Sequence, residues 1–411
     1  MANSDWIVLL AAITCAAAVL PGTLGILMLT NRLAAEARGA RLIYQHSRIL
    51  LMASAAGLVL AWVIAIQDDA VSGPLLAGTI LYAGVLGFGF LMHTRLLFRP
   101  IRRPTFISVA QALERFDAAE EVVGILDPKG DPYAFIARLA RRPHVVHQPD
   151  GQAPFTMTHC ILSHSSMAYE NSGAFDKPDI MVTAAIANNM VFYDAKNRCS
   201  ITQLHNASRD GSLPLKTLPS LMMRLATWAE LYPDSRIWVR AKTWRDAFYL
   251  KVLSRADVID PESPVLIYPL MNPSDERLPL KSQVLGVEIA GAERAYPLAA
   301  LNDGQPLNDE LGGVPILIVS AFDNDYAQIF IRQLKDGTTL NFRLSGESGT
   351  LTDTETGSSW DLKGHCKAGP RSGDSLQPVP HYNKIFWFAW ADYHPNTEIC
   401  LPRDSARDQA A

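Results

Sequence analysis

The first hundred residues contain three long runs without a charged side chain. They cover residues 6–30, 49–66 and 71–92, which are 25, 18 and 22 residues long. A helix rises about 1.5 Å per residue, so about 20 residues cross the roughly 30 Å hydrocarbon core of a bilayer. The runs therefore predict three transmembrane helices in a membrane anchor spanning residues 1–103. They favour this interpretation over a buried hairpin or a cleaved signal peptide.

Arginines predict the orientation of this anchor. The segment MANSD and the turn QDDA contain no Lys or Arg, whereas arginines follow the first and third runs. They are Arg32, Arg38, Arg41, Arg48, Arg95, Arg99, Arg102 and Arg103. Positive residues flanking spans favour the cytoplasmic side. We therefore expect a multi-pass protein of the bacterial inner membrane whose soluble part is cytoplasmic, with a membrane protein as a possible partner.

Composition and charge limit the partners and the cysteine chemistry that this protein can have. The net charge is −4, 19% of residues are charged, and no long basic run is present, which argues against nucleic acid as a partner. Five cysteines scattered over 411 residues do not resemble a disulfide framework, so reduced thiols are expected. Nothing in the sequence indicates the oligomeric state.

The soluble part contains an internal repeat. Four residue types recur at nearly constant separations of 162, 161, 159 and 162 positions, in the pairs Gly124/Gly286, Pro154/Pro315, Asp194/Asp353 and Trp228/Trp390. Chance matches would drift more, so a tandem duplication of about 160 residues is predicted. We interpret both aspartates as structural, since each adjoins turn residues where a carboxylate commonly binds backbone amides.

Within each copy, short β-rich runs alternate with Gly, Asp and Asn, and a helix is predicted near the end. In the first copy that helix would carry Leu221, Leu225, Trp228 and Leu231 on one apolar face. The expected fold is α+β: two homologous strand-rich domains in tandem, preceded by three transmembrane helices. The domains would span 104–256 and 283–411, joined by an extended Pro-rich connector over 257–282.

Several motifs resemble one family. In the second copy they are LGVEIAGAERAYPL, DELGGVPILI, TDTETGSSW and FAWADYHPNT, and in the first APFTMTHCILS and ATWAELYPDS. Together they resemble the bacterial domain of unknown function family 3179 over residues 120–401. The resemblance implies no assigned activity. It does imply thiol or metal chemistry at a C-x-x-C/T element, and frequent export, which leaves a periplasmic soluble part as the alternative.

Chemistry is expected in the first copy, where TMTHCILSHS places Cys160 near two imidazoles. Ser163 stands where a resolving thiol would be, which disfavours dithiol exchange. If the segment is extended, Cys160 and His164 share a face while His159 points away. The motif CSITQLH adds a second Cys/His pair. Cys160, His164, Cys199 and His205 are thus candidate ligands for zinc or copper.

Two other interpretations stay open. Cys160 could be a catalytic nucleophile, with His159 or His164 as its base. Alternatively, the cysteines are small core residues and the protein is a non-catalytic binding or scaffold module. His144 and His147 are secondary candidates that could line the same cleft. The second copy has Ser320 and Ala321 where the first has His159 and Cys160, so it is expected to be inert there.

Overall fold

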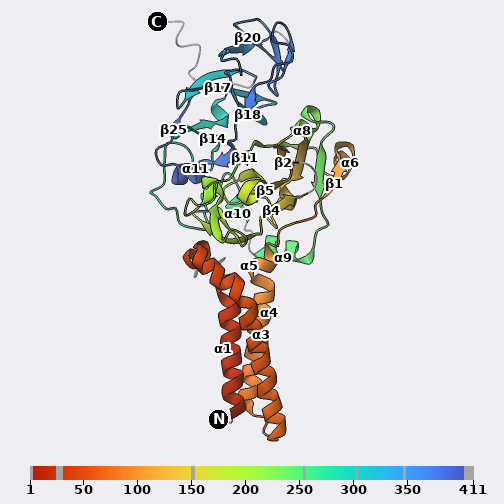
Figure 1. Ribbon diagram of the computed structural model, residues 1–411, viewed down its shortest axis with the longest axis vertical. Coiled ribbons are helices and arrows are strands. Elements are labelled where there is room, and N and C mark those ends of the chain that lie inside the picture. The colour runs from red at the N-terminus through yellow and green to blue at the C-terminus, as the bar shows by residue number, and fades with distance from the viewer. Residues whose placement is uncertain are drawn as a thin grey trace.

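The computed structural model describes residues 3–24, 31–149, 153–252, 256–301, 304–345 and 349–401. It is 33% helical and 32% strand, which confirms the mixed α+β class. Figure 1 shows three long helices side by side, projecting from a strand-rich part. The helices are α1 (Asn3–Leu24), α2 (Asn31–Ala35), α3 (Ala37–Gln67), α4 (Gly73–Met92), α5 (Thr94–Leu97), α6 (Val109–Arg115), α7 (Ala137–Ala140), α8 (Leu225–Leu231), α9 (Trp244–Val252), α10 (Ala256–Ile259) and α11 (Trp387–Tyr393), with 3₁₀ turns η1 (Gly173–Phe175), η2 (Gln203–His205) and η3 (Leu298–Ala300).

Helices α1, α3 and α4 are long and apolar enough to cross a membrane, as the sequence predicted. Residues 25–30 of the first predicted span lie outside the described residues. Large apolar side chains such as Met52, Ile66 and Ile80 face outward and are about two-thirds exposed or more, at 66%, 66% and 73%. Such surface is unfavourable in water and suits contact with lipid. The short helices α2 and α5 pack against β7 and so join the anchor to the strand-rich part.

The first strand-rich half, residues 105–239, contains three antiparallel or mixed sheets in the part that the structure describes. Their strand orders are β1-β13-β3-β2-β12, β11-β6-β5-β4 and β10-β9-β8-β7. The strands are β1 (Thr105–Ser108), β2 (Glu121–Leu126), β3 (Pro132–Ile136), β4 (Val145–Gln148), β5 (Phe155–Cys160), β6 (Ser165–Glu170), β7 (Ile180–Ile186), β8 (Asn189–Asp194), β9 (Cys199–Thr202), β10 (Ala207–Ser208), β11 (Thr217–Leu218), β12 (Ser220–Arg224) and β13 (Arg236–Val239).

The second half, residues 283–399, also contains three sheets among its described residues. Their orders are β24-β14-β15-β25, β16-β17-β18-β23 and β19-β20-β21-β22. The strands are β14 (Gln283–Ile289), β15 (Ala292–Pro297), β16 (Leu307–Leu311), β17 (Val314–Ala321), β18 (Tyr326–Ile331), β19 (Phe342–Leu344), β20 (Thr350–Asp353), β21 (Ser359–Asp361), β22 (Cys366–Ala368), β23 (Gln377–Pro378), β24 (Tyr382–Phe386) and β25 (Glu398–Ile399).

The two halves have the same strand order, apart from the extra edge strand β1. In each, a hairpin (β2–β3 or β14–β15) is flanked by one antiparallel strand and one short parallel strand, β13 or β25. A fully buried tryptophan covers the glycine of the hairpin: a Cβ on Gly124 would meet Trp228 at 1.9 Å, and one on Gly286 would meet Trp390 at 2.3 Å. Only glycine admits such close approach, which explains this part of the repeat.

The halves interlock instead of packing as separate units. Strand β12 of the first half contacts β18 of the second, while β24 of the second contacts β6 of the first. Asn383 joins three strands, because its Oδ1 accepts from the Met222 backbone N–H at 3.0 Å and its Nδ2 donates to the Ala327 carbonyl at 2.8 Å. One hydrophobic cluster accordingly contains residues from both halves.

Two local expectations were wrong. The predicted closing helix of the first copy is strand β12 followed by the seven-residue helix α8, so Leu221 pairs with Gly124 in a sheet. Sheet pairing outcompetes the helical spacing there. The Pro-rich connector is irregular after Ile259, as expected, but it is packed: Asn188 donates to the Tyr268 carbonyl at 2.7 Å and accepts from the Ile267 and Tyr268 amides.

Candidate metal centre

Two carboxylates face each other next to the turn of the β14–β15 hairpin. In the antiparallel register, Glu288 lies directly opposite Glu293. Like charges at such a position repel and destabilise the pair. Glu288 is exposed and Glu293 half-buried, and the structure records no ion pair for Glu288 among its described residues. This arrangement leaves negative charge without full compensation.

An imidazole completes the group from the end of helix α11. His394 caps the helix and stacks on Trp390 with a ring separation of 3.8 Å, which holds the ring in place. Its Nδ1 is 2.8 Å from a Glu293 carboxylate oxygen. His394 is only 3% exposed, yet its Nε2 has no hydrogen-bond partner among the residues that the structure describes. Buried polar atoms nearly always have a partner, so this nitrogen marks a place where one is missing.

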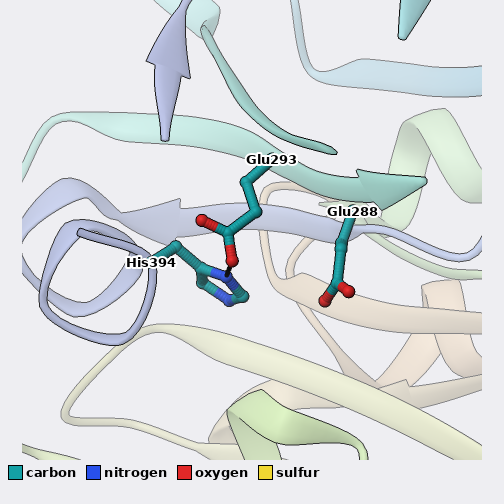
Figure 2. A group of neighbouring side chains, drawn as sticks. All are labelled: Glu288, Glu293 and His394. Carbon is teal, nitrogen blue, oxygen red and sulfur yellow. Dashed lines mark hydrogen bonds and ion pairs between the residues drawn. The ribbon is translucent and has the colours of Figure 1, made fainter. Parts of the chain in front are cut away.

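Figure 2 shows the imidazole of His394 below Glu293 and beside Glu288. One ligand atom from each residue lies within 4.8 Å of the other two, and no other set of three or more His, Cys, Asp or Glu side chains does so in the described parts of the chain. Small side-chain rotations would place all three around one ion at the roughly 2.0–2.2 Å bond lengths of zinc. We call Glu288, Glu293 and His394 the triad.

The first half supplies the surroundings of the triad. Turn η2 contacts α11, and His205 in this turn packs edge-on against Tyr393 at 5.1 Å. Burial lowers the pKa of His205, and nearby His394 lowers it further. The ring of His205 therefore stays neutral at pH 7.

The donor set favours particular metals. Imidazole nitrogen suits zinc, copper, iron and nickel, whereas carboxylate oxygen suits harder ions. Three protein ligands leave a position open, as in catalytic zinc sites, and exposed Glu288 places that position next to solvent.

The equivalent place in the first half has no such chemistry. The cross-strand pair corresponding to Glu288 and Glu293 is Leu126 and Pro132. The residue that caps the corresponding helix is Tyr232, which stacks on Trp228 at 4.3 Å. The scaffold is thus the same, while three ligands in one half are replaced by apolar and aromatic side chains in the other.

The extended segment on which the expected pairing of Cys160 with His164 depends is not formed. Strand β5 ends at Cys160, and His164 occupies a tight turn in the left-handed region (φ 50°). The turn places His164 beside His159, and both line a small pocket of about 90 Å³. The Cys160 thiol faces elsewhere, 3.7 Å from the Asn188 carbonyl. The alternation of an unbroken strand does not apply across a turn.

The other predicted ligands are also engaged separately. Cys199 is buried on β9, and desolvation with help from Asp194 raises its pKa to about 12. A thiol with such a pKa stays protonated at neutral pH in the metal-free protein, whereas the thiolate is the form that binds a metal. The structure does not bring Cys160, His164, Cys199 and His205 into one group among the described residues. Zinc or copper binding by that set, and catalysis by Cys160, stay predictions.

The secondary candidates are buried histidines with local partners. His144 Nδ1 is 2.9 Å from the His159 carbonyl, His147 Nδ1 is 2.9 Å from Thr156 Oγ1, and His159 Nδ1 is 2.9 Å from Ser166 Oγ. Desolvation lowers their pKa values to about 4, 4 and 3, respectively. All three are therefore neutral at pH 7. Asp194 and Asp353 both accept hydrogen bonds from nearby backbone amides, as the sequence predicted.

A charged network lies where the halves meet. His164 Nε2 is 3.0 Å from a Glu121 carboxylate oxygen, and its Nδ1 donates to the Lys384 carbonyl of the second half at 2.8 Å. Burial opposes both charges, but the pairing lowers the pKa of Glu121 to about 2 and raises that of His164. At the matching positions the second half has Gln283 and Asp325, and Asp325 pairs with Lys384 at 2.8 Å. Each of these ion pairs lies within one half, and the hydrogen bond from His164 to the Lys384 carbonyl joins the halves.

The fold and the site define a protein with three helices able to span a membrane, two interlocked strand-rich halves, and an open carboxylate and imidazole cluster. The chain belongs to the family described as Protein of unknown function (DUF3179), whose family model matches residues 99–397. No curated protein and no solved structure matches it.

The sequence did not reveal the triad because His394 lies 101 and 106 positions after Glu293 and Glu288, and only the folded structure brings it to them. A signal was present in the repeat itself. Comparing the copies position by position shows charged or ligating residues in the second where the first has Leu126, Pro132 and Tyr232.

Proposed function

We propose that this protein is a membrane-anchored metal-binding protein, with one divalent transition ion held by Glu288, Glu293 and His394. The observation that carries the proposal is the group itself, in which one ligand atom from each of two directly opposed glutamates and a buried histidine lies within 4.8 Å of the other two. A cation relieves the repulsion between the carboxylates, and the imidazole supplies a nitrogen ligand. Zinc fits best, because it accepts mixed nitrogen and oxygen ligands in a four-coordinate site.

The site is suited to reversible binding or to metal-assisted chemistry more than to permanent structural binding. A structural zinc site has four protein ligands, whereas the triad supplies three and opens to solvent at Glu288. The open position would bind water or a ligand. Since the triad sits on a scaffold that the first half reproduces without it, the fold does not depend on the ion.

The anchor gives this activity a location. We infer a multi-pass protein of the bacterial inner membrane, with the strand-rich part on the cytoplasmic side because of the arginines that flank the spans. The family resemblance favours the periplasm instead. Protease digestion of spheroplasts and of inverted vesicles distinguishes the two, since cleavage in spheroplasts indicates a periplasmic soluble part.

The test uses the full chain purified in mild detergent, stripped with a chelator and titrated with Zn²⁺ by calorimetry. We expect one ion per chain. The variants Glu288→Leu and His394→Tyr introduce the first-half residues, and each should weaken binding by about 100-fold, or roughly 2.7 kcal/mol. Both substitutions keep side chains that the same scaffold already accommodates, so loss of folding is not expected.

Matched controls separate the triad from the sequence-based set. His365→Gln removes an exposed histidine in the second half and should leave binding unchanged. Cys160→Ser and Cys199→Ser should also leave it unchanged. If instead the cysteine variants abolish binding while Glu288→Leu does not, the ion belongs to the first half. Absence of zinc binding by the intact chain would favour a scaffold function.

A further inference from the structure

The three long helices leave a crevice on one side of the bundle. Helix α1 packs along both α3 and α4, while α3 and α4 contact each other little. The resulting groove has a volume of about 670 Å³. It lies toward the end of the bundle that meets the strand-rich part, because its lining includes residues on both sides of the end of α4, among them Phe90 and Leu96.

The body of the crevice is apolar and shaped by small residues. Val19, Leu51 and Leu86 line it, and Ala83 and Gly87 of α4 leave the space open. A Cβ on Gly87 would meet no atom within 4 Å. By contrast, Gly89 is filled from behind, since a Cβ there would meet Val19 at 1.9 Å. The groove therefore fits a flexible hydrocarbon chain.

Cations gather at the mouth of the crevice. Arg48 and Arg95 both line it, and each lies within three residues of the end of an uncharged run. Arg245 from α9 stacks over Phe90 at 4.6 Å and donates to its carbonyl at 3.1 Å. Arg95 donates to the Tyr44 carbonyl at 3.2 Å, whereas exposed Arg48 has no recorded partner among the described residues.

Membrane depth explains the combination. Arginines at the end of apolar spans lie at the level of lipid headgroups, where anionic lipids attract basic side chains. Guanidinium groups bind phosphate through two parallel hydrogen bonds. Arg48 and Arg95 line the same crevice, so their like charges repel across it, although Asp179 offsets part of the charge of Arg95. An anion between them would remove that repulsion.

We propose that this crevice is a binding site for one anionic phospholipid, with an acyl chain against Gly87 and the phosphate between Arg48 and Arg95. Charge complementarity at the mouth selects an anionic headgroup over a zwitterionic one. The site lies in the membrane anchor and is independent of the triad, so its failure or success leaves the metal proposal untouched.

The test is native mass spectrometry of the full chain in detergent, titrated with phosphatidylglycerol or with phosphatidylcholine of the same acyl chains. We expect one phosphatidylglycerol to bind more tightly than phosphatidylcholine. Arg48→Gln should weaken phosphatidylglycerol about fivefold, which corresponds to about 1 kcal/mol for one basic group. Gly87→Leu should block binding of either lipid by filling the groove.

Two controls match these variants. Gly84→Leu adds the same side chain at another open position of α4 that does not line the crevice, and Arg99→Gln removes an exposed arginine at the same membrane boundary. Both should bind phosphatidylglycerol as the unmodified chain does. Equal binding of the two lipids, or unaltered binding in both Arg48→Gln and Gly87→Leu, would mean surrounding bilayer lipid only and would overturn the proposal.

Discussion

The two strand-rich halves build the same framework and use it differently. Each places a tryptophan over a hairpin glycine and ends the following helix with a ring stacked on that tryptophan. In the first half the ring is Tyr232 and the hairpin end is apolar, while in the second the ring is His394 and the hairpin end carries two glutamates. Chemistry is thus placed at the rim of a shared scaffold.

The two halves also differ in their charged residues at the seam, which is the surface where they meet. Here the first half contributes Glu121 and His164, whereas the second has Gln283 and Asp325 at the matching positions. Charged residues lie on both sides, but in different pairs. The comparison indicates that framework residues are constrained by packing, while positions at hairpin ends and turns are free to diverge toward function.

The largest expected effect tests the shared framework. Trp228→Ala and Trp390→Ala should each lower the free energy of unfolding by about 3–5 kcal/mol, because a fully buried tryptophan leaves a cavity over a glycine. Urea denaturation of the detergent-solubilised chain, followed by tyrosine and tryptophan fluorescence, measures both. Comparable losses support equivalent roles, and a loss below about 1 kcal/mol in either variant would break the comparison.

Lowering the pH should destabilise the first half more than the second. Burial lowers the pKa values of His144, His147 and His159 in the first half to about 4, 4 and 3, and that of His381 in the second to about 4. The unfolded chain binds protons on these groups from about pH 6.5 downward, so native stability falls as pH drops from 6.5 toward 4, by roughly 1–3 kcal/mol per imidazole.

Hydrogen exchange at pH 7 and pH 5, corrected for intrinsic rates, measures this loss by segment. The strands around β4 and β5 should lose more protection than those around β17 and β18. Because the halves interlock, a parallel loss of protection in both would show instead that they unfold as one cooperative unit.

A smaller effect concerns the seam. Glu121→Gln should destabilise the protein by about 1–2 kcal/mol at pH 6, since one partner of the ion pair with His164 is removed and the pair is partly screened. The lowered pKa of Glu121 makes its contribution present above about pH 4.5 and lost toward pH 2. The raised pKa of His164 makes its contribution present below about pH 6.5 and lost as the pH rises through the folded value.

The deficit of the Glu121→Gln variant should therefore be greatest between about pH 4.5 and 6.5 and smaller at pH 9. Chemical denaturation of both proteins at pH 4.5, 6.5 and 9 measures this deficit. Glu114→Gln, an exposed change on α6, serves as the charge-matched control. A deficit that does not vary with pH would assign Glu121 a packing role only.

The smallest effect changes sign with metal. Without metal, Glu288→Gln should stabilise the protein by about 0.2–1 kcal/mol, because it removes repulsion from the opposed Glu293. With excess zinc the order should reverse, since binding stabilises only the unmodified chain strongly. Thermal unfolding with and without zinc measures both. Stabilisation of the two proteins by the same amount would count against the triad.

Much of the architecture was available from the sequence. Three uncharged runs were enough to predict the three helices that are long and apolar enough to span a membrane, because length and hydropathy alone define such a candidate. The constant spacing of Gly124/Gly286 and Trp228/Trp390 predicted equivalent packing, and in the structure Gly124 lies against Trp228 as Gly286 lies against Trp390. The two halves have the same strand order, while the tandem duplication stays a prediction.

The candidate site could not be predicted, for two physical reasons. A four-residue turn reversed the chain after Cys160, so His164 left the face that strand alternation assigned to it. The triad depends on an antiparallel register and on the end of a helix about a hundred residues later, and neither is encoded in local spacing. Local patterns fix elements, whereas sites arise from their assembly.

Anomalous diffraction at the zinc edge, from crystals of the full chain grown with zinc, tests the central claim most directly. We predict one peak between Glu288, Glu293 and His394, within about 2.0–2.2 Å of the ligand atoms. A peak beside the Cys160 or Cys199 sulfur, with none at the triad, would contradict the account.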